Sequence, residues 1–153
     1  MQKKITTFLT FNDQALQAAE YYTSTFKSSK ITSTMPGPGG SVMAVNFELE
    51  GQEFMALNGG PSFSFSDGIS LFVSCETQAE VDELWAKLTA GGSENQCGWL
   101  KDRFGVSWQI IPTALPRLMS SPVPGAAGRV VQAMLKMQKI EIAALQAAHD
   151  ASP

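Results

Sequence analysis

The sequence is poor in the side chains that most often carry chemistry. It has one histidine, His149, and two cysteines, Cys75 and Cys97, in 153 residues. The cysteines lack the spacing of a zinc site, and two in a chain of this length are typical of a reducing compartment rather than of a disulfide scaffold. The sequence therefore predicts a cytoplasmic protein.

Charge and long apolar runs are also scarce. Charged residues make up 16% of the chain, the net charge is −3, and Lys3-Lys4 is too short to form a basic patch for nucleic acid. No apolar run approaches the roughly 20 residues of a membrane span, and threonines interrupt the first apolar run, so no signal peptide is expected. With 44% apolar residues, the chain is expected to be a soluble globular protein with neither nucleic-acid nor membrane partners.

What is present is a pattern of strands and helices that occurs twice. Residues 4–11 alternate as a strand, apolar residues from Ala15 to Phe26 recur at helical spacing, and residues 41–58 read as a hairpin. A second unit repeats this layout, and at an offset of 63 positions Tyr22 falls on Trp85. The repeat predicts an α+β fold of two βαβββ modules, residues 4–60 and 67–112, in a curled mixed sheet around a cavity.

The second module contains the most informative stretch, residues 102–112. Two sets of side chains alternate along its strand, one apolar (Val106, Trp108, Ile110) and one mixed (Ser107, Gln109, Ile111). The apolar set requires a helix or core against it, which leaves Gln109 on the side that faces the cavity. Pro112 ends the strand because proline cannot donate to a β-ladder.

Residues 115–153 are predicted to be an extension of a domain that spans residues 1–114. Prolines and glycines in residues 115–128 indicate a linker, and Arg129–His149 has the pattern of one amphipathic helix. The apolar face of this helix is wide, so it must pack against the domain or against a second chain. We expect a homodimer.

Several motifs resemble those of one protein superfamily. The duplicated layout resembles the vicinal oxygen chelate superfamily, which includes glyoxalase I, bleomycin-resistance proteins and extradiol dioxygenases. Four stretches are similar to its PhnB-like branch, sometimes labelled demethylubiquinone-methyltransferase-like: residues 70–73, 80–85, 102–110 and 134–140. Phe104 stands where that branch more often has tyrosine.

The resemblance implies where a metal would be held. Enzymes of this superfamily hold a divalent metal with four strand residues, and those positions fall here on Thr6, Asn58, Ser70 and Gln109. None is a histidine or a carboxylate, so we predict no metal and no cofactor. The methyltransferase label implies S-adenosylmethionine, but the sequence has no glycine-rich loop between a strand and a helix.

The same positions predict a pocket for a small molecule. We expect ligand binding by polar and aromatic side chains that face the cavity: Thr6, Asn58, Ser70, Phe72, Trp99 and Gln109. The first hypothesis is a metal-free protein that binds a small organic molecule. The alternative is an enzyme, namely a metal-dependent lyase, isomerase or dioxygenase, or a methyltransferase as the label suggests, with Glu48 as the candidate general base. A third possibility is a vestigial cavity filled by the protein's own side chains.

Overall fold

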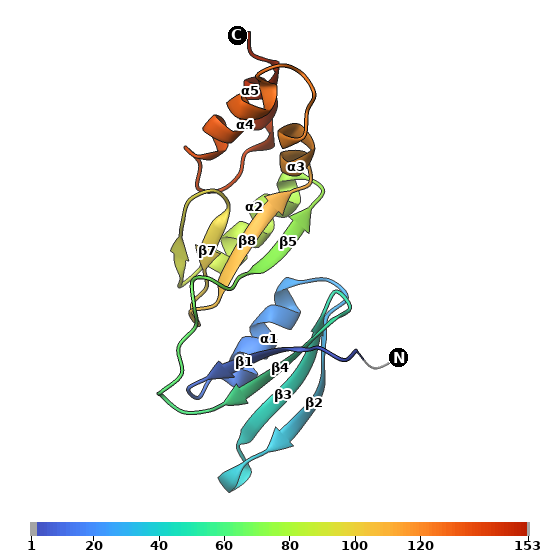
Figure 1. Cartoon of the computed structure of the whole chain (residues 1–153). Helices are drawn as coiled ribbons and strands as arrows, with labels where there is room; N and C mark the ends of the chain where they lie inside the picture. The colour runs from blue at the N-terminus through green and yellow to red at the C-terminus, as the bar shows by residue number, and fades with distance from the viewer. Residues whose placement is uncertain (1–2, 153) are drawn as a thin grey trace. The chain divides into compact units, whose positions relative to one another are not determined.

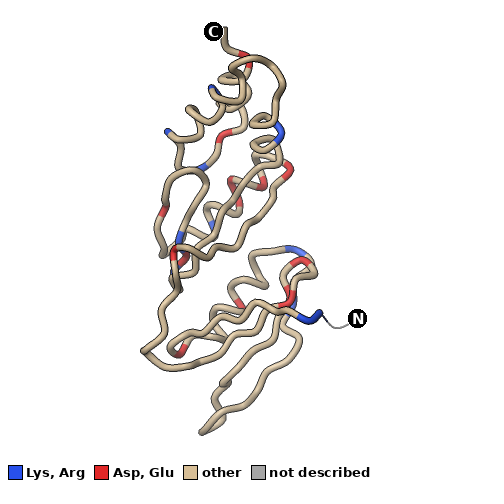
Figure 2. Tube along the Cα trace, in the orientation of Figure 1, with Lys and Arg blue, Asp and Glu red and all other residues tan. Residues whose placement is uncertain are grey.

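A computed structural model describes residues 3–152, and it consists of two compact units that divide between Ser64 and Phe65. Each unit contains a four-stranded mixed sheet with a helix on one face, so the α+β class is confirmed (Figure 1). We call the two sheets sheet A and sheet B. Within the described residues, no helix is long and apolar enough to cross a membrane. Lys and Arg positions are scattered along the chain rather than gathered on one face (Figure 2).

Unit 1 follows the order that its pattern predicts. Its elements are β1 (Thr7–Phe11), α1 (Ala15–Thr25), β2 (Lys30–Pro36), a 3-10 turn η1 (Pro38–Gly40), β3 (Val42–Leu49) and β4 (Gln52–Asn58). The sheet order is β1-β4-β3-β2, with β1 parallel to β4 and the other pairs antiparallel. The stretch of prolines and glycines after residue 35 is largely regular, because Pro36 still belongs to β2 and Pro38–Gly40 form η1.

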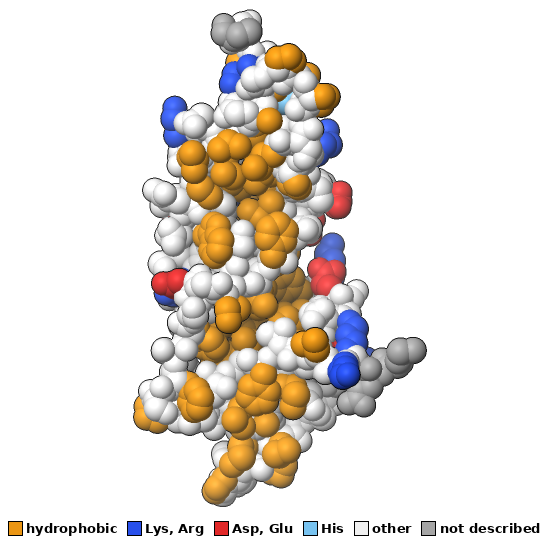
Figure 3. Space-filling view, viewed as in Figure 1, with side chains coloured by type: hydrophobic (Ala, Val, Ile, Leu, Met, Phe, Trp, Pro, Cys, Tyr) orange, Lys and Arg blue, Asp and Glu red, His pale blue; other side chains and the backbone are white. Residues whose placement is uncertain are grey.

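Alternation along the strands of unit 1 decides which face α1 covers. Val45, Phe47 and Leu49 of β3 are buried on the α1 side, and the Phe47 ring stacks on Phe54 with the centroids 5.2 Å apart. Tyr22 of α1 is fully buried and lies 6.2 Å from Phe47. The opposite face of sheet A, which we call its open face, carries exposed apolar side chains over the strands (Figure 3).

Unit 2 repeats the same topology with shorter strands. Its strands and the helix that covers them are β5 (Leu71–Cys75), α2 (Gln78–Thr89), β6 (Ser93–Glu94), β7 (Trp99–Lys101) and β8 (Ser107–Pro112). The order β5-β8-β7-β6, with β5 parallel to β8, is the order of sheet A with each strand replaced by its counterpart. The duplication is therefore confirmed, whereas the curling of the two modules around one cavity stays a prediction.

The capping box and the alternation of β8 are both observed in unit 2. Thr77 Oγ1 accepts the Glu80 N–H at 3.2 Å, and the Glu80 carboxylate reaches back to the backbone N–H of Glu76 rather than to that of Thr77. Trp108 and Ile110 are buried on the α2 side of sheet B. The other face, which we call the open face of sheet B, bears Gln109.

The tail differs from the single helix that its pattern predicted. Three helices form instead: α3 (Ala114–Met119) within the expected linker, then α4 (Ala126–Met134) and α5 (Ile142–Asp150). The chain turns between α4 and α5 because its backbone there is hydrogen-bonded to the segment before β7. The carbonyls of Met137 and Gln138 accept the N–H groups of Cys97 and Gly98. Wide apolar faces allow the three helices to form a core with the end of β8, made of Ile111, Ala114, Leu115, Leu118, Val130, Ile140 and Leu145.

Candidate functional site

Four of the predicted ligand-binding residues lie together on the open face of sheet B. Phe72 of β5 and Trp99 of β7 are both in register with Gln109 of β8, so the three side chains form one row across three strands. Ser70, just before β5, accepts a hydrogen bond from Gln109 Nε2 at 2.9 Å. Phe72 is 58% exposed, which is unusual for a phenylalanine on a sheet. The row is available for contact with another molecule.

A second line of polar groups borders this row. Lys101 of β7 is in register with Ser107 of β8, and its ammonium lies 2.7 Å from the carboxylate of Asp67. Both side chains of the ion pair are substantially exposed, so its contribution to stability is small. The open face of sheet B thus combines two aromatic rings, an amide, hydroxyls and one neutralised ion pair.

The turn between β7 and β8 explains the characteristic stretch of residues 102–110. The buried carboxylate of Asp102 accepts the N–H groups of Phe104 and Val106 through Oδ1, at 2.9 and 3.0 Å, and the indole N–H of Trp108 through Oδ2, at 2.8 Å. Gly105 has a φ of 92°, which favours glycine. Because these bonds fix the turn and anchor Trp108 on the α2 side, they hold Gln109 on the open face.

Sequence reasoning did not single out Asp102, Lys101 or Asp67. For Asp102 a signal was present, because an acidic residue before a glycine turn and six positions before a tryptophan can bind both the turn amides and the indole. No comparable signal joins Asp67 to Lys101, because that contact depends on the path of a loop.

Asn58 lies elsewhere, and the prediction that its side chain is on the open side of its sheet, facing a cavity, is wrong. It is in register with Phe11, on the face that α1 covers. There its Oδ1 accepts the N–H of Ala15, the first residue of α1, at 2.8 Å, and its Nδ2 donates to the Val42 carbonyl at 3.1 Å. Asn58 therefore caps α1 from a strand. Asn12 and Asp13, which precede α1 in the chain and are residue types that often cap helices, supply no side-chain cap.

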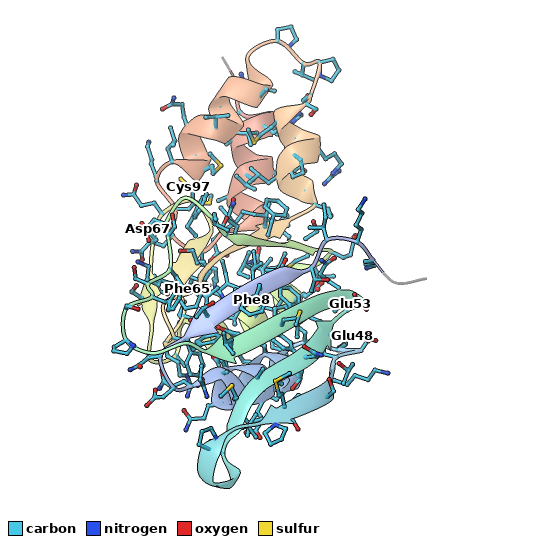
Figure 4. The ribbon with its side chains drawn as sticks, turned by 60° about the horizontal axis from the view of Figure 1, so that its bottom comes forward. Phe8, Glu48, Glu53, Phe65, Asp67 and Cys97 are labelled. Carbon is cyan, nitrogen blue, oxygen red and sulfur yellow. The ribbon has the colours of Figure 1, made fainter. Side chains whose placement is uncertain are left out.

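Thr6 and Glu48 lie on the open face of sheet A, in unit 1. A hollow of about 260 Å³ is lined there by Thr6, Thr32, Asn46, Phe47, Glu48, Glu53, Phe54 and Met55. Glu48 is directly opposite Glu53 on one side and Lys30 on the other (Figure 4 shows the two glutamates on neighbouring strands). Two carboxylates in register repel each other, and Lys30 offsets part of that repulsion.

His149, the lone histidine, joins parts of the tail. Its Nδ1 lies 2.8 Å from Asp150 Oδ1 and its Nε2 lies 2.7 Å from Ser121 Oγ. Arg129 donates to the carbonyls of Ala148 and His149, at 2.9 and 2.7 Å. The hydrogen bond from His149, followed by that from Gln146, holds the pKa of Asp150 below its ordinary value of 3.8. These contacts fasten the last turn of α5 to α4 and to the connection before it.

Comparison with known proteins then decides the family. Residues 3–111 match the model of the family described as 3-demethylubiquinone-9 3-methyltransferase. The chain belongs to this family. A PhnB protein from Bacillus cereus has 36% sequence identity, and the similarity covers 72% of this chain and 100% of that one with a TM-score of 0.69. The predicted membership of the PhnB-like branch is therefore confirmed. No curated protein matches it.

More distant structures share the fold of the PhnB-like family. A glyoxylase/bleomycin resistance protein/dioxygenase domain from Frankia sp. EAN1pec has 17% identity and a TM-score of 0.50, covering 73% of this chain and 92% of that one. The fosfomycin resistance protein FosX from Listeria monocytogenes, complexed with Mn(II) and sulfate, has 14% identity and a TM-score of 0.52 over 71% of this chain and 89% of that one. At these identities the likeness concerns the fold, which is that of the vicinal oxygen chelate proteins.

The side chains of this family member do not fit a divalent metal of the FosX kind. Among residues 3–152, no three His, Cys, Asp or Glu side chains come together as ligands would. Of the four positions expected from the resemblance, Asn58 is engaged with backbone groups, and Gln109 and Ser70 are hydrogen-bonded to each other. Neutral amide and hydroxyl oxygens do not balance the charge of a dication.

Proposed function

We propose that this protein binds a small organic molecule on the open face of sheet B, without a metal. The in-register row of Phe72, Gln109 and Trp99 carries the proposal, because it joins exposed aromatic surface to a polar group that can orient a ligand. Ser70 adds a hydroxyl next to the amide. A few polar groups within apolar surface are the usual composition of a small-molecule site.

The proposed site does not include Thr6 or Asn58, which lie in unit 1. Thr6 lines the hollow on sheet A. Asn58 caps the first turn of α1. The proposal therefore depends on the four residues of unit 2.

The test is a fragment screen followed by amide chemical shifts on isotope-labelled full-length protein. We expect hits that contain a ring to move the amide signals of residues 70–74, 99–101 and 107–111. Phe72→Ala should abolish these shifts, whereas Ile69→Ala should leave them, because Ile69 is a comparably exposed apolar residue in the segment that leads into β5. Hits that move only signals outside these residues would refute the site.

The alternative function is an enzyme with Glu48 as general base. The observation in its favour is that Glu48 lines the hollow on sheet A together with Glu53 and Thr6, which gives a carboxylate on an uncovered face. Methyl transfer requires S-adenosylmethionine, yet the β1–α1 connection (residues 12–14) and the β5–α2 connection (residues 76–77) contain no glycine. These residues do not fit such a site. Titration of S-adenosylmethionine into wild type and Glu48→Gln tests this alternative, and saturable binding would support it.

We also propose a cytoplasmic homodimer. The apolar side chains of the tail, which suggested a dimer in the sequence, are largely buried against one another and against the end of β8 in the same chain. Support now comes from the open face of sheet A, where Phe8, Met35 and Met55 are 37–58% exposed. Both cysteines are free, which is consistent with a reducing compartment. Light scattering coupled to gel filtration should give twice the chain mass, and Phe8→Ser should shift it toward the monomer.

A further inference from the structure

The hydrogen bonding of Gln109 limits which ligands the open face of sheet B can accept. A glutamine amide has one oxygen that accepts and two N–H groups that donate. Nε2 uses one hydrogen on Ser70 Oγ at 2.9 Å, and within residues 3–152 this is the hydrogen bond that the Gln109 side chain makes. Oε1 and the second N–H therefore remain for a ligand. The amide therefore offers a ligand both an acceptor and a donor.

The neighbours of Gln109 determine the shape of the ligand. Phe72 and Trp99 stand in register on either side of it, on strands that are spaced about 5 Å apart. A planar ring can contact both aromatic side chains while its edge meets the amide between them. A branched aliphatic molecule would use this row poorly, because it has no flat face to place against the rings.

The charge around the row determines the charge of the ligand. Lys101 is the cation on this face of β7, and Asp67 neutralises it at 2.7 Å. Gln109, Ser70, Phe72 and Trp99 are all uncharged. An anion would have to displace Asp67 from Lys101, and a cation would meet no unpaired carboxylate in the row. The observations therefore favour a neutral molecule.

We infer that the ligand is a neutral, planar ring that carries a hydrogen-bond donor and an acceptor next to each other, as in a cyclic amide. Its donor would bind Gln109 Oε1, and its acceptor would take the remaining Nε2 hydrogen, in the same paired manner in which glutamine amides bind the adenine edge. The rings of Phe72 and Trp99 would hold its faces. This inference rests on the proposed function and specifies its ligand class.

Three matched probes separate shape from hydrogen bonding. Isoquinolin-1(2H)-one has the adjacent N–H and carbonyl, its N-methyl derivative lacks the donor, and naphthalene retains only the bicyclic ring. Titrated into the full-length protein and followed by calorimetry and amide shifts, the cyclic amide should bind about tenfold more tightly than its N-methyl derivative, the discrimination expected for one paired set of hydrogen bonds. Naphthalene should be weaker than both.

The variant Gln109→Met removes the amide and keeps the fold. Methionine is the residue that the first module has at the equivalent strand position, Met55, so the substitution suits the sheet. We expect Gln109→Met to bind the cyclic amide and its N-methyl derivative equally, and Gln132→Met, on the exposed side of α4, to behave as wild type.

The possible outcomes distinguish this inference from the proposed function. Equal binding of all three probes to wild type, with shifts on sheet B that Phe72→Ala abolishes, would overturn the ligand class and leave the binding site standing. Preference for the cyclic amide that persists in Gln109→Met would overturn the role of Gln109. No binding of any probe would overturn the ligand class, and the fragment screen would then decide the proposed function separately.

Discussion

The two modules have the same topology but carry different side chains at equivalent positions. Phe8 of β1 faces Met55 of β4 in unit 1, and Phe72 of β5 faces Gln109 of β8 in unit 2. The next strand contributes Asn46 in unit 1 and Trp99 in unit 2. A common backbone thus presents an apolar pair beside an amide in one module and an amide between two rings in the other. Topology supports the row of side chains, and sequence decides its chemistry.

The modules also differ in how they stabilise their helices and their ends. In unit 1, Asn58 caps α1 from the last strand, and the equivalent position in unit 2 is Pro112, which has no side-chain donor or acceptor. Unit 2 caps α2 locally with Thr77. It also receives a tail, whereas unit 1 ends at its strands. The following experiments test these differences.

The largest effect is expected from Asp102→Ala. Three N–H groups lose their acceptor, and two of them, those of Val106 and the Trp108 indole, are buried, so the free energy of unfolding should fall by about 3–5 kcal/mol. Urea unfolding measures the change. Asp67→Ala, which removes only an exposed ion pair, should change the same quantity by less than about 1 kcal/mol. Equal effects of the two substitutions would contradict the role of Asp102.

A somewhat smaller effect is expected from Gly98→Ala, which tests the junction between sheet B and the tail. Gly98 has a φ of 84°, and an added Cβ would lie 2.7 Å from Ile111 Cδ1 of β8 and 3.1 Å from Cγ1 of Ile140, a residue of the tail. The substitution should cost about 2–3 kcal/mol and speed amide hydrogen exchange in the tail helices.

Gly51→Ala is the control for this experiment. Gly51 also has a φ of 84°, but nothing lies within 4 Å of its added Cβ, so only the backbone cost of about 1 kcal/mol is expected. If Gly98→Ala lowers the free energy of unfolding no more than Gly51→Ala does, then close packing of the tail around Gly98 does not limit this position.

Asn58→Ala should destabilise unit 1 by about 2 kcal/mol, since it removes a helix cap and a second hydrogen bond to the Val42 carbonyl. Thr77→Ala, which removes only the local cap of α2, should cost about 1 kcal/mol. Thermal unfolding compares the two variants. A larger loss for Thr77→Ala would reverse the ranking of the two capping modes.

The smallest effect concerns the ion pair between Lys139 of the tail and Asp82 of α2, 2.9 Å apart. The hydrogen bond from Lys139, and then that from Gln78, holds the pKa of Asp82 below its ordinary value of 3.8, and the bond to Asp82 raises the pKa of Lys139 above 10.5.

This ion pair should therefore stabilise the fold between about pH 4 and pH 10. Its contribution is lost as the pH falls through the lowered pKa of Asp82, and again as it rises through the raised pKa of Lys139. Asp82→Asn should lower the unfolding temperature slightly at pH 7, and by less at pH 2.5. Glu83→Gln, which changes a different ion pair on α2, serves as the control. An Asp82→Asn effect as large at pH 2.5 as at pH 7 would contradict this assignment.

Much of the fold follows from local pattern. Alternation in β8 predicted which side chains α2 covers, and β3 shows the same alternation against α1, because a strand places successive residues on opposite faces. The Thr77 cap is equally local. Asn58 shows what local pattern does not give. In β4 it follows the parity of Phe54 and Ala56, which are buried against α1, so strict alternation already places it on that face. What alternation does not show is that its amide accepts the N–H of Ala15, 43 positions earlier in the chain.

The tail shows the same limit over a longer range. Its helical periodicity was visible in the sequence, but the break between α4 and α5 was not. The backbone there is fixed by hydrogen bonds from Cys97 and Gly98, and Gln78 clamps the residues that begin α5, accepting the Ile142 N–H at 2.7 Å and donating to the Ile140 carbonyl at 2.9 Å. These partners are some 40 to 60 positions away in the chain.

The sequence by itself determined the duplicated α+β modules, the family and the set of polar and aromatic residues on sheet B, because all of these depend on period, motif and residue type. Only the tertiary structure decided that Ser70 and Gln109 bond to each other, that Asn58 turns to α1, and that the tail divides into three helices. Each of these depends on which groups meet across long loops, and hydrogen bonds formed there outweigh local preference.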